Sequence, residues 1–263
     1  MNDNHSTEAG KPRRGIYLLP NLFTTAALFA GFYAIVAAMG GRFEAAAVAI
    51  FIAMVLDGLD GRVARLTNTQ SAFGAEYDSL SDMVSFGLAP ALVMYEWSLH
   101  SMGKIGWLAA FIYTAGAALR LARFNTQLEV ADKRYFQGLP SPAAAAVVTG
   151  LVWVGYDYDV AGTALAWLTC VVTISIGVLM VSNVRFYSFK ELDLKGRVPF
   201  MAMLVVILVF VLVSLDPPQV LFGTFVLYAL SGPLVTGWLL LRHRRQRKAG
   251  GMVGADQPGR KGD

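Results

Sequence analysis

Cysteine, histidine and charged residues are scarce in this chain of 263 residues. Cys170, in an apolar segment, is the single cysteine. A chain with one cysteine can form neither an internal disulfide nor a CxxC metal site. The three histidines are His5 near the N-terminus, His100 between two apolar segments and His243 in a basic run near the C-terminus. Only 15% of the residues are charged, against about 25% in soluble globular domains. This low charge content indicates a membrane protein.

Apolar sequence is abundant: 56% of the residues are hydrophobic and the mean hydropathy is +0.52. A helix needs roughly 17 to 25 apolar residues to cross a bilayer. Segments of this kind predict about eight transmembrane helices, at residues 18–39, 43–66, 74–96, 104–124, 140–156, 162–181, 198–214 and 219–241. We therefore expect an all-α polytopic membrane protein. One membrane-embedded domain would cover residues 16–241, between disordered tails at residues 1–15 and 242–263.

Basic residues are distributed unequally between the two sides that eight helices define. All 22 Lys and Arg residues except Arg42 and Lys104 fall on the side that carries both termini. Cytoplasmic loops are enriched in Lys and Arg, so we expect both termini to be cytoplasmic. The pI near 9.2 then reflects residues that meet anionic membrane lipids, and it requires no nucleic-acid partner. The connector at residues 182–197 would lie on the same side, where an interfacial amphipathic helix is one interpretation.

Four aspartates interrupt the second and third apolar segments near this cytoplasmic side. They belong to the pattern DxxDGxxAR(x8)GxxxDxxxD, formed by Asp57, Asp60, Gly61, Ala64, Arg65, Gly74, Asp78 and Asp82. At about 100° per residue, the first two aspartates share one face of their helix, and the last two share one face of the next helix. The short polar segment at residues 66–73 makes these helices antiparallel neighbours. We therefore expect the four carboxylates to converge.

Converging carboxylates require a counter-charge, because burying like charges together in a medium of low dielectric constant is costly. Arg65, the arginine of the motif, supplies only one positive charge. Carboxylates without His or Cys favour hard cations that bind substrate phosphates, so we expect two ions of Mg²⁺ or Mn²⁺. Arg65 could pair with phosphate oxygens. Gly61, Ala64 and Gly74 would let a bulky ligand, or equally a neighbouring helix, approach the backbone.

The complete pattern resembles the signature of the CDP-alcohol phosphotransferase family. Its members are integral membrane enzymes that transfer a phosphoalcohol from a CDP-alcohol to an acceptor hydroxyl and release CMP. By this resemblance, Asp57, Asp60 and Asp78 hold two divalent metals on the pyrophosphate. Asp82 would bind the second metal and act as general base, a role that no histidine of this chain is placed to fill. The residues expected to contact the CDP-alcohol are Gly61, Arg65, Ser71, Gly74, Asn21 and Thr24.

The identity of the acceptor alcohol is suggested by three further segments. They are LPNLFT at residues 19–24, RLARFN at residues 120–125 and YFQGLPSPAAA at residues 135–145. These segments are similar to those of bacterial membrane-spanning phosphatidylserine synthases, and the similarity covers about residues 15–200. It implies CDP-diacylglycerol as donor and L-serine as acceptor. Arg120 and Arg123 could bind the serine carboxylate with help from Asn125. Anchoring at lipid headgroups accounts for the two arginines equally well.

The expected activity is that of a CDP-diacylglycerol–serine O-phosphatidyltransferase in a bacterial-type inner membrane, with a cytoplasmic active site. Glycerol 3-phosphate, inositol phosphate or choline would be alternative acceptors within the family, and a homodimer is expected by analogy alone. An ion or metabolite transporter could also place aspartates in a helical bundle. The acidic residues crowd into one half of the membrane, and no matching broken helices occur in a second half. Both features argue against a transporter.

Overall fold

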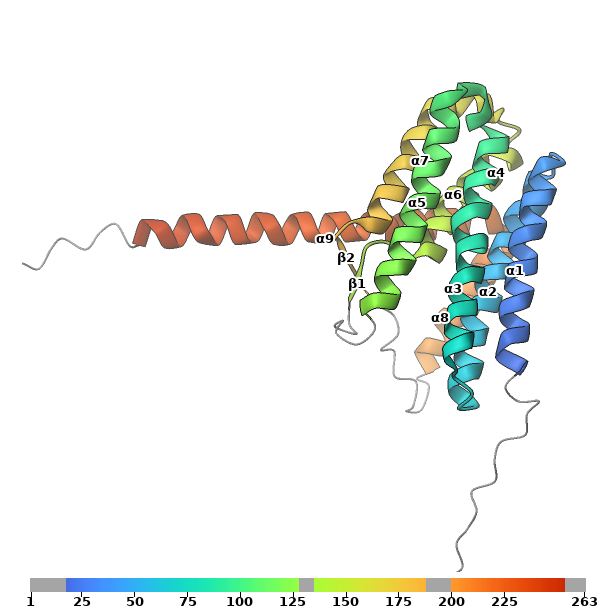
Figure 1. Ribbon diagram of the computed structural model, residues 1–263. Coiled ribbons are helices and arrows are strands. Elements are labelled where there is room, and N and C mark those ends of the chain that lie inside the picture. Colours follow the sequence, from blue (N-terminus) through green and yellow to red (C-terminus); the bar gives the residue numbers. More distant parts are fainter. Residues whose placement is uncertain (1–17, 128–134, 188–199, 254–263) are drawn as a thin grey trace, which may run out of the picture.

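Helices form almost all of the part of the chain that the computed structural model describes, residues 18–127, 135–187 and 200–253 (Figure 1). The α-helices are α1 (Leu18–Met39), α2 (Phe43–Leu66), α3 (Ala72–Asp82), α4 (Ala89–Trp97), α5 (Lys104–Gln127), α6 (Ser141–Asp157), α7 (Ala166–Val181), α8 (Phe200–Leu215) and α9 (Pro217–Val253). A π-helical segment, η2 (Met83–Leu88), joins α3 to α4. The 3-10 turns η3 (Leu99–Met102) and η4 (Gly162–Leu165) precede α5 and α7.

Each of the eight predicted segments corresponds to helix in the structure, so the helical membrane fold class is confirmed. By length and composition alone, four segments of the described residues could cross a membrane: Leu19–Met39, Lys104–Thr126, Gly162–Val181 and Pro217–Gly237. The remaining helices are less apolar or shorter, since α2 carries charged residues and α8 has only 16 residues. Eight crossings therefore stay a prediction.

Small residues allow the first two helices to pack closely. The buried alanines along them are Ala27, Ala30, Ala34, Ala37 and Ala38 on α1, with Ala46, Ala47, Ala49 and Ala53 on α2. Side chains of this size let helix backbones approach in a membrane. The turn between the helices contains Gly41, whose φ of +70° lies in the left-handed region that glycine adopts without strain. This hairpin carries half of the aspartate motif.

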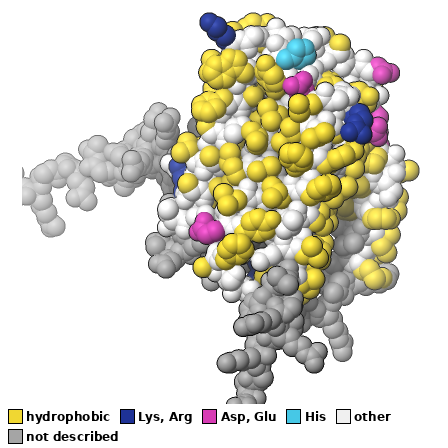
Figure 2. Space-filling model, turned by 45° about the vertical axis from the view of Figure 1, so that its right-hand side comes forward, with side chains coloured by type: hydrophobic (Ala, Val, Ile, Leu, Met, Phe, Trp, Pro, Cys, Tyr) yellow, Lys and Arg dark blue, Asp and Glu magenta, His cyan; other side chains and the backbone are white. Residues whose placement is uncertain are grey.

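The centre of the bundle is α6, which packs against α2, α4, α7 and α9. Its residues from Ala143 to Gly150 are all buried, as expected of a helix that is apolar on every side. The outer surface is also apolar, and Figure 2 shows a face covered largely by hydrophobic side chains with few charged ones. A large apolar surface on the outside fits contact with lipid.

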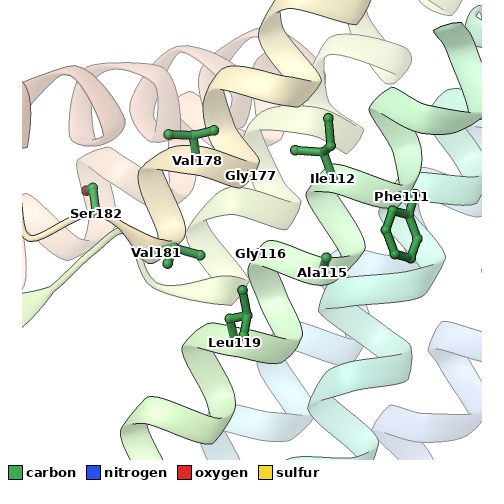
Figure 3. A pocket seen from close by; sticks show the side chains of 9 residues that line it. All are labelled: Phe111, Ile112, Ala115, Gly116, Leu119, Gly177, Val178, Val181 and Ser182. Carbon is green, nitrogen blue, oxygen red and sulfur yellow. The ribbon is translucent and has the colours of Figure 1, made fainter.

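Two glycines bring α5 and α7 together. A side chain at Gly116 would collide with the carbonyl group of Gly177, and a Cβ atom at Gly177 would lie 2.8 Å from Cα of Tyr113. Beside this crossing is an open apolar groove of about 440 Å³, lined by residues of both helices, including Leu119 and Val178 (Figure 3). These two side chains are each 59% exposed, so the groove lies on the outer surface of the bundle.

A two-stranded antiparallel sheet was not expected from the sequence. It pairs β1 (Tyr135–Gln137) with β2 (Arg185–Tyr187), and Phe136 lies opposite Phe186. The ring of Phe186 is fully buried and packs 5.6 Å from that of Tyr228. Residues 185–187 of the predicted connector are thus strand rather than amphipathic helix, because a buried aromatic anchors them. Residues 188–197 of that connector lie outside the described residues.

The last helix is longer than predicted and leaves the bundle at a steep angle (Figure 1). Where we expected a disordered tail from residue 242, α9 continues to Val253. The sequence from 242 to 249, RHRRQRKA, is rich in residues of good helix propensity. Residues 1–17, which contain the predicted N-terminal tail, lie outside the described residues.

Candidate metal and active site

The four aspartates of the motif lie together where α2 and α3 face one another. One carboxylate oxygen from each of Asp57, Asp60 and Asp78 lies within 4.8 Å of the other two. Asp82, the last residue of α3, interacts electrostatically with Asp57 and Asp78. We call these four residues the carboxylate cluster. Their roles as ligands and base stay predictions.

A tight polar turn brings α3 back beside α2. Asn68 adopts a φ of +50°, a conformation that asparagine tolerates better than most residues. The hydroxyl of Thr67 donates to the carbonyl of Val63, and at the start of α3 the hydroxyl of Ser71 accepts a 3.0 Å hydrogen bond from the backbone N–H of Gly74. Ser71 is therefore the N-cap of α3, in addition to its predicted place near the nucleotide.

The chemistry of the cluster fits a hard divalent cation. Asp60 is only 5% exposed, and its carboxylate lies beside that of Asp78. Atom Oδ1 of Asp78 is buried and has no hydrogen-bond partner among the described residues. A buried carboxylate oxygen without a donor is costly, and several oxygens so close together favour a cation of the Mg²⁺ or Mn²⁺ type. Asp57, Asp60 and Asp78 are thus suited to hold one.

Helix α1 supports the cluster from the side. The hydroxyl of Thr24 donates a 2.7 Å hydrogen bond to Oδ2 of Asp60, and the hydroxyl of Ser81 on α3 donates to the carbonyl oxygen of Thr24. The predicted contact of Thr24 was with the nucleotide or phosphates, whereas its hydroxyl faces a carboxylate. Asn21 lies near the start of α3, because a Cβ atom at Gly74 would be 3.5 Å from its Oδ1.

The face of α2 that carries Gly61 is open. Apart from the neighbouring residues and backbone of α2 itself, no described atom lies within 4 Å of the place where a Cβ of Gly61 or of Gly58 would be. Arg65 is exposed one turn further along the same helix. A ligand could therefore approach the α2 backbone beside the cluster, as the small residue at position 61 had suggested.

Arg120 on α5, one of the predicted serine-binding residues, lies beside the cluster, and its interaction with Asp82 was not foreseen from the sequence. Its guanidinium interacts electrostatically with Asp82, and Nη1 donates a 2.7 Å hydrogen bond to the buried hydroxyl of Ser141 at the start of α6. The Nε of Arg120 is buried and has no partner among the described residues. No sequence signal joins positions 82 and 120, so this counter-charge emerges only from the packing of α5 against η2, which directly follows Asp82.

The other two residues predicted to bind the acceptor form hydrogen bonds to neighbouring helices. Nη1 of Arg123 donates a 2.9 Å hydrogen bond to the carbonyl oxygen of Val181, the last residue of α7. An arginine at this place satisfies a carbonyl that the helix end leaves free. The amide of Asn125 donates a 3.1 Å hydrogen bond to the hydroxyl of Ser79 on α3. Both residues connect α5 to neighbouring helices.

Comparison with known proteins identifies a family and several relatives. The model of a family described as CDP-alcohol phosphatidyltransferase matches residues 17–175, a range that contains the carboxylate cluster and Arg120. Two relatives from Helicobacter pylori, strains 26695 and J99, are each 38% identical. They align with 88% and 83% of this chain and with 94% and 92% of their own lengths. A relative from Mycobacterium leprae is 36% identical over 68% of this chain and 61% of its own length. All three relatives are named CDP-diacylglycerol–serine O-phosphatidyltransferase.

Proposed function

Because this chain belongs to the CDP-alcohol phosphatidyltransferase family, we propose that it transfers the phosphatidyl group of CDP-diacylglycerol to the hydroxyl of L-serine. The products are phosphatidylserine and CMP. The observation that carries the proposal is the carboxylate cluster, placed beside Arg120 and an open helix face. The names of the Helicobacter pylori relatives support serine as the acceptor and CDP-diacylglycerol as the donor.

The divalent cations would be Mg²⁺ or Mn²⁺. Asp57, Asp60 and Asp78 would hold one ion, and Asp82 would contribute to a second. Bound ions of this kind neutralise the pyrophosphate and polarise it for displacement. Thr24 keeps Oδ2 of Asp60 oriented by donating its hydroxyl hydrogen at 2.7 Å.

The donor would lie against the open face of α2. Gly61 lets the pyrophosphate approach the backbone, and the exposed guanidinium of Arg65 neutralises phosphate oxygens. Asn21, Ser71 and Gly74 meet at the start of α3, where we place the nucleotide. The acyl chains stay in the surrounding lipid, so the donor enters sideways from the bilayer.

The acceptor would lie between Arg120 and Asp82, because these two side chains are close enough to interact electrostatically. Arg120 binds the carboxylate of serine, and Asp82 takes the proton of its hydroxyl. The serine oxygen then bonds to the phosphorus that carries diacylglycerol. The bond from this phosphorus to the bridging oxygen of the pyrophosphate breaks, and CMP leaves with the electron pair. Arg123 and Asn125 act indirectly, by holding α5 against α7 and α3.

The chain is an integral membrane protein. We place it in a bacterial-type inner membrane with both termini and the active site on the cytoplasmic side, on the strength of its Lys and Arg distribution. The catalytic domain would span residues 16–241, and a homodimer is proposed as its assembly by analogy with the family.

The decisive experiment measures CMP release by the purified protein in lipid nanodiscs that contain CDP-diacylglycerol. We expect release to require L-serine, to stop when EDTA removes divalent cations, and to return when Mn²⁺ or Mg²⁺ is restored. Parallel reactions contain glycerol 3-phosphate, inositol phosphate or choline in place of serine. Release of CMP with one of these acceptors but not with serine would refute the assignment of serine.

A further inference from the structure

The helix that carries Asp78 and Asp82 changes its winding directly after the cluster. Residues Met83–Leu88 form the π-helical segment η2, in which the N–H of Ala89 donates to the carbonyl of Val84, five residues earlier. A π turn accommodates one more residue than an α turn. The helix that follows is therefore rotated by the angle of one residue, about 100°.

This rotation matches the burial pattern on either side of η2. The residues that face neighbouring helices are Asp78, Ser81 and Asp82 on α3 and Val93, Met94 and Trp97 on α4. At about 100° per residue around the helix axis, with Asp78 at zero, the α3 set is centred at about −10° and the α4 set at about 110°. An uninterrupted α-helix could not turn both sets inward. One additional residue in η2 rotates α4 by about 100°, which removes nearly the whole angular difference between the two sets.

Two features favour the π winding of η2. Pro90 has no N–H, so it cannot donate to the carbonyl of Phe86 as residue 90 of a regular α-helix would. The hydroxyl of Tyr113 on α5 donates a 2.9 Å hydrogen bond to that same carbonyl oxygen. Tyr113 is fully buried, and it lies where α5 packs against η2. On the opposite side, the hydroxyl of Ser85 donates to the carbonyl of Ala27 on α1.

We propose that Tyr113 is a positioning residue whose hydrogen bond to Phe86 keeps η2 in π geometry and thereby aims Asp78 and Asp82 at the aspartates of α2. Loss of the hydroxyl leaves the carbonyl of Phe86 without this donor. The rotation of α3 relative to α4 is then less firmly held, and the carboxylate cluster binds cations less tightly. The inference rests on the proposed function only in assuming that the cluster holds a divalent cation.

Mn²⁺ binding to the full chain in nanodiscs, measured by electron paramagnetic resonance without either substrate, tests the inference. We expect Tyr113→Phe to raise the Kd for Mn²⁺ by roughly 3- to 10-fold, in line with the loss of one buried hydrogen bond. Pro90→Ala should act in the same direction, because its N–H can donate to Phe86 in α geometry. Tyr95→Phe is the matched control, since the hydroxyl of this α4 tyrosine makes no hydrogen bond to the described residues.

The outcomes separate this inference from the proposed function. A Kd for Mn²⁺ that Tyr113→Phe leaves unchanged, with or without a lower melting temperature, would overturn the positioning role. Mn²⁺ binding that depends on Tyr113, in a protein that releases no CMP with serine, would refute the serine assignment and support this inference. A parent chain that binds no Mn²⁺ would overturn both.

Discussion

Replacing Asp78 by asparagine should make the metal-free protein more stable while removing its response to divalent cations. Asn and Asp have nearly the same size, so the substitution changes charge and leaves the packing intact. Asp78 is repelled by Asp57 and Asp60, whose oxygens lie within 4.8 Å of its own. Without a cation, that repulsion opposes folding.

The size of the effect follows from these distances. Two unit charges 4.8 Å apart repel by about 3.5 kcal/mol at an effective dielectric constant of about 20. A proton held between Asp60 and Asp78 offsets part of this repulsion in the metal-free protein. We therefore expect Asp78→Asn to stabilise the metal-free protein by about 1 to 3 kcal/mol, which corresponds to roughly 2 to 10 °C in melting temperature.

The response to metal should change in the opposite direction. For the parent chain, Mn²⁺ at 100 times its Kd should stabilise the fold by about 2.7 kcal/mol. Asp78→Asn loses one of three clustered ligands, so we expect no rise in melting temperature at the same concentration. The rate of CMP release should fall by about 100-fold or more, since even residues that only support metal ligands cost 10- to 100-fold.

The assay is thermal unfolding in nanodiscs, with EDTA and then with increasing Mn²⁺. Glu76→Gln is the matched control, because Glu76 is an exposed carboxylate on the same helix and lies outside the cluster. Its unfolding curves should follow those of the parent chain under both conditions. If Asp78→Asn melted below the parent chain in EDTA, or kept the full Mn²⁺ response, the idea of a repulsive cluster that a cation stabilises would be wrong.

Three other predictions test the donor site, the acceptor site and the helix packing. Arg120→Gln should raise the KM for serine by roughly 10- to 100-fold and leave that for CDP-diacylglycerol nearly unchanged; the reverse pattern in steady-state kinetics would contradict the proposed acceptor site. Gly61→Leu should fill the open space over α2 and reduce CMP release without lowering the melting temperature, because leucine favours helix more than glycine does. Full activity of that variant would remove Gly61 from the donor site. Gly177→Ala should destabilise the fold by about 1 to 3 kcal/mol, since its Cβ meets the backbone of Tyr113, whereas Gly223→Ala, with open space around it, is the control for thermal unfolding.

The membrane fold could be predicted in detail because hydropathy is a local property. A span of apolar residues must form a helix in lipid, where every backbone polar group needs a partner within the segment. The predicted segment 43–66 has the same bounds as α2, and 140–156 differs from α6 by one residue at each end. The strands β1 and β2 were missed because they pair residues about 50 positions apart and are only three residues long.

The interruption of the third segment was also missed. Pro90 was visible in the sequence, but a proline near the start of a helix is ordinarily compatible with regular winding. Only the packing of η2 between α1 and α5 shows that the helix must rotate at this point. The rotation is needed because α3 and α4 pack against different sets of neighbouring helices. The sequence of this one segment does not reveal which helices these are.

The sequence by itself determined that this protein lies in a membrane, that its four motif aspartates occupy matching helix faces, and that hard cations suit them. Helical periodicity decides which residues of one helix share a face, and this rule needs no knowledge of the partner. The tertiary structure alone decided that Arg120 lies close to Asp82, that Arg123 bonds to the end of α7, and that Thr24 bonds to Asp60. These contacts join residues 36 to 58 positions apart, and they depend on how whole helices pack.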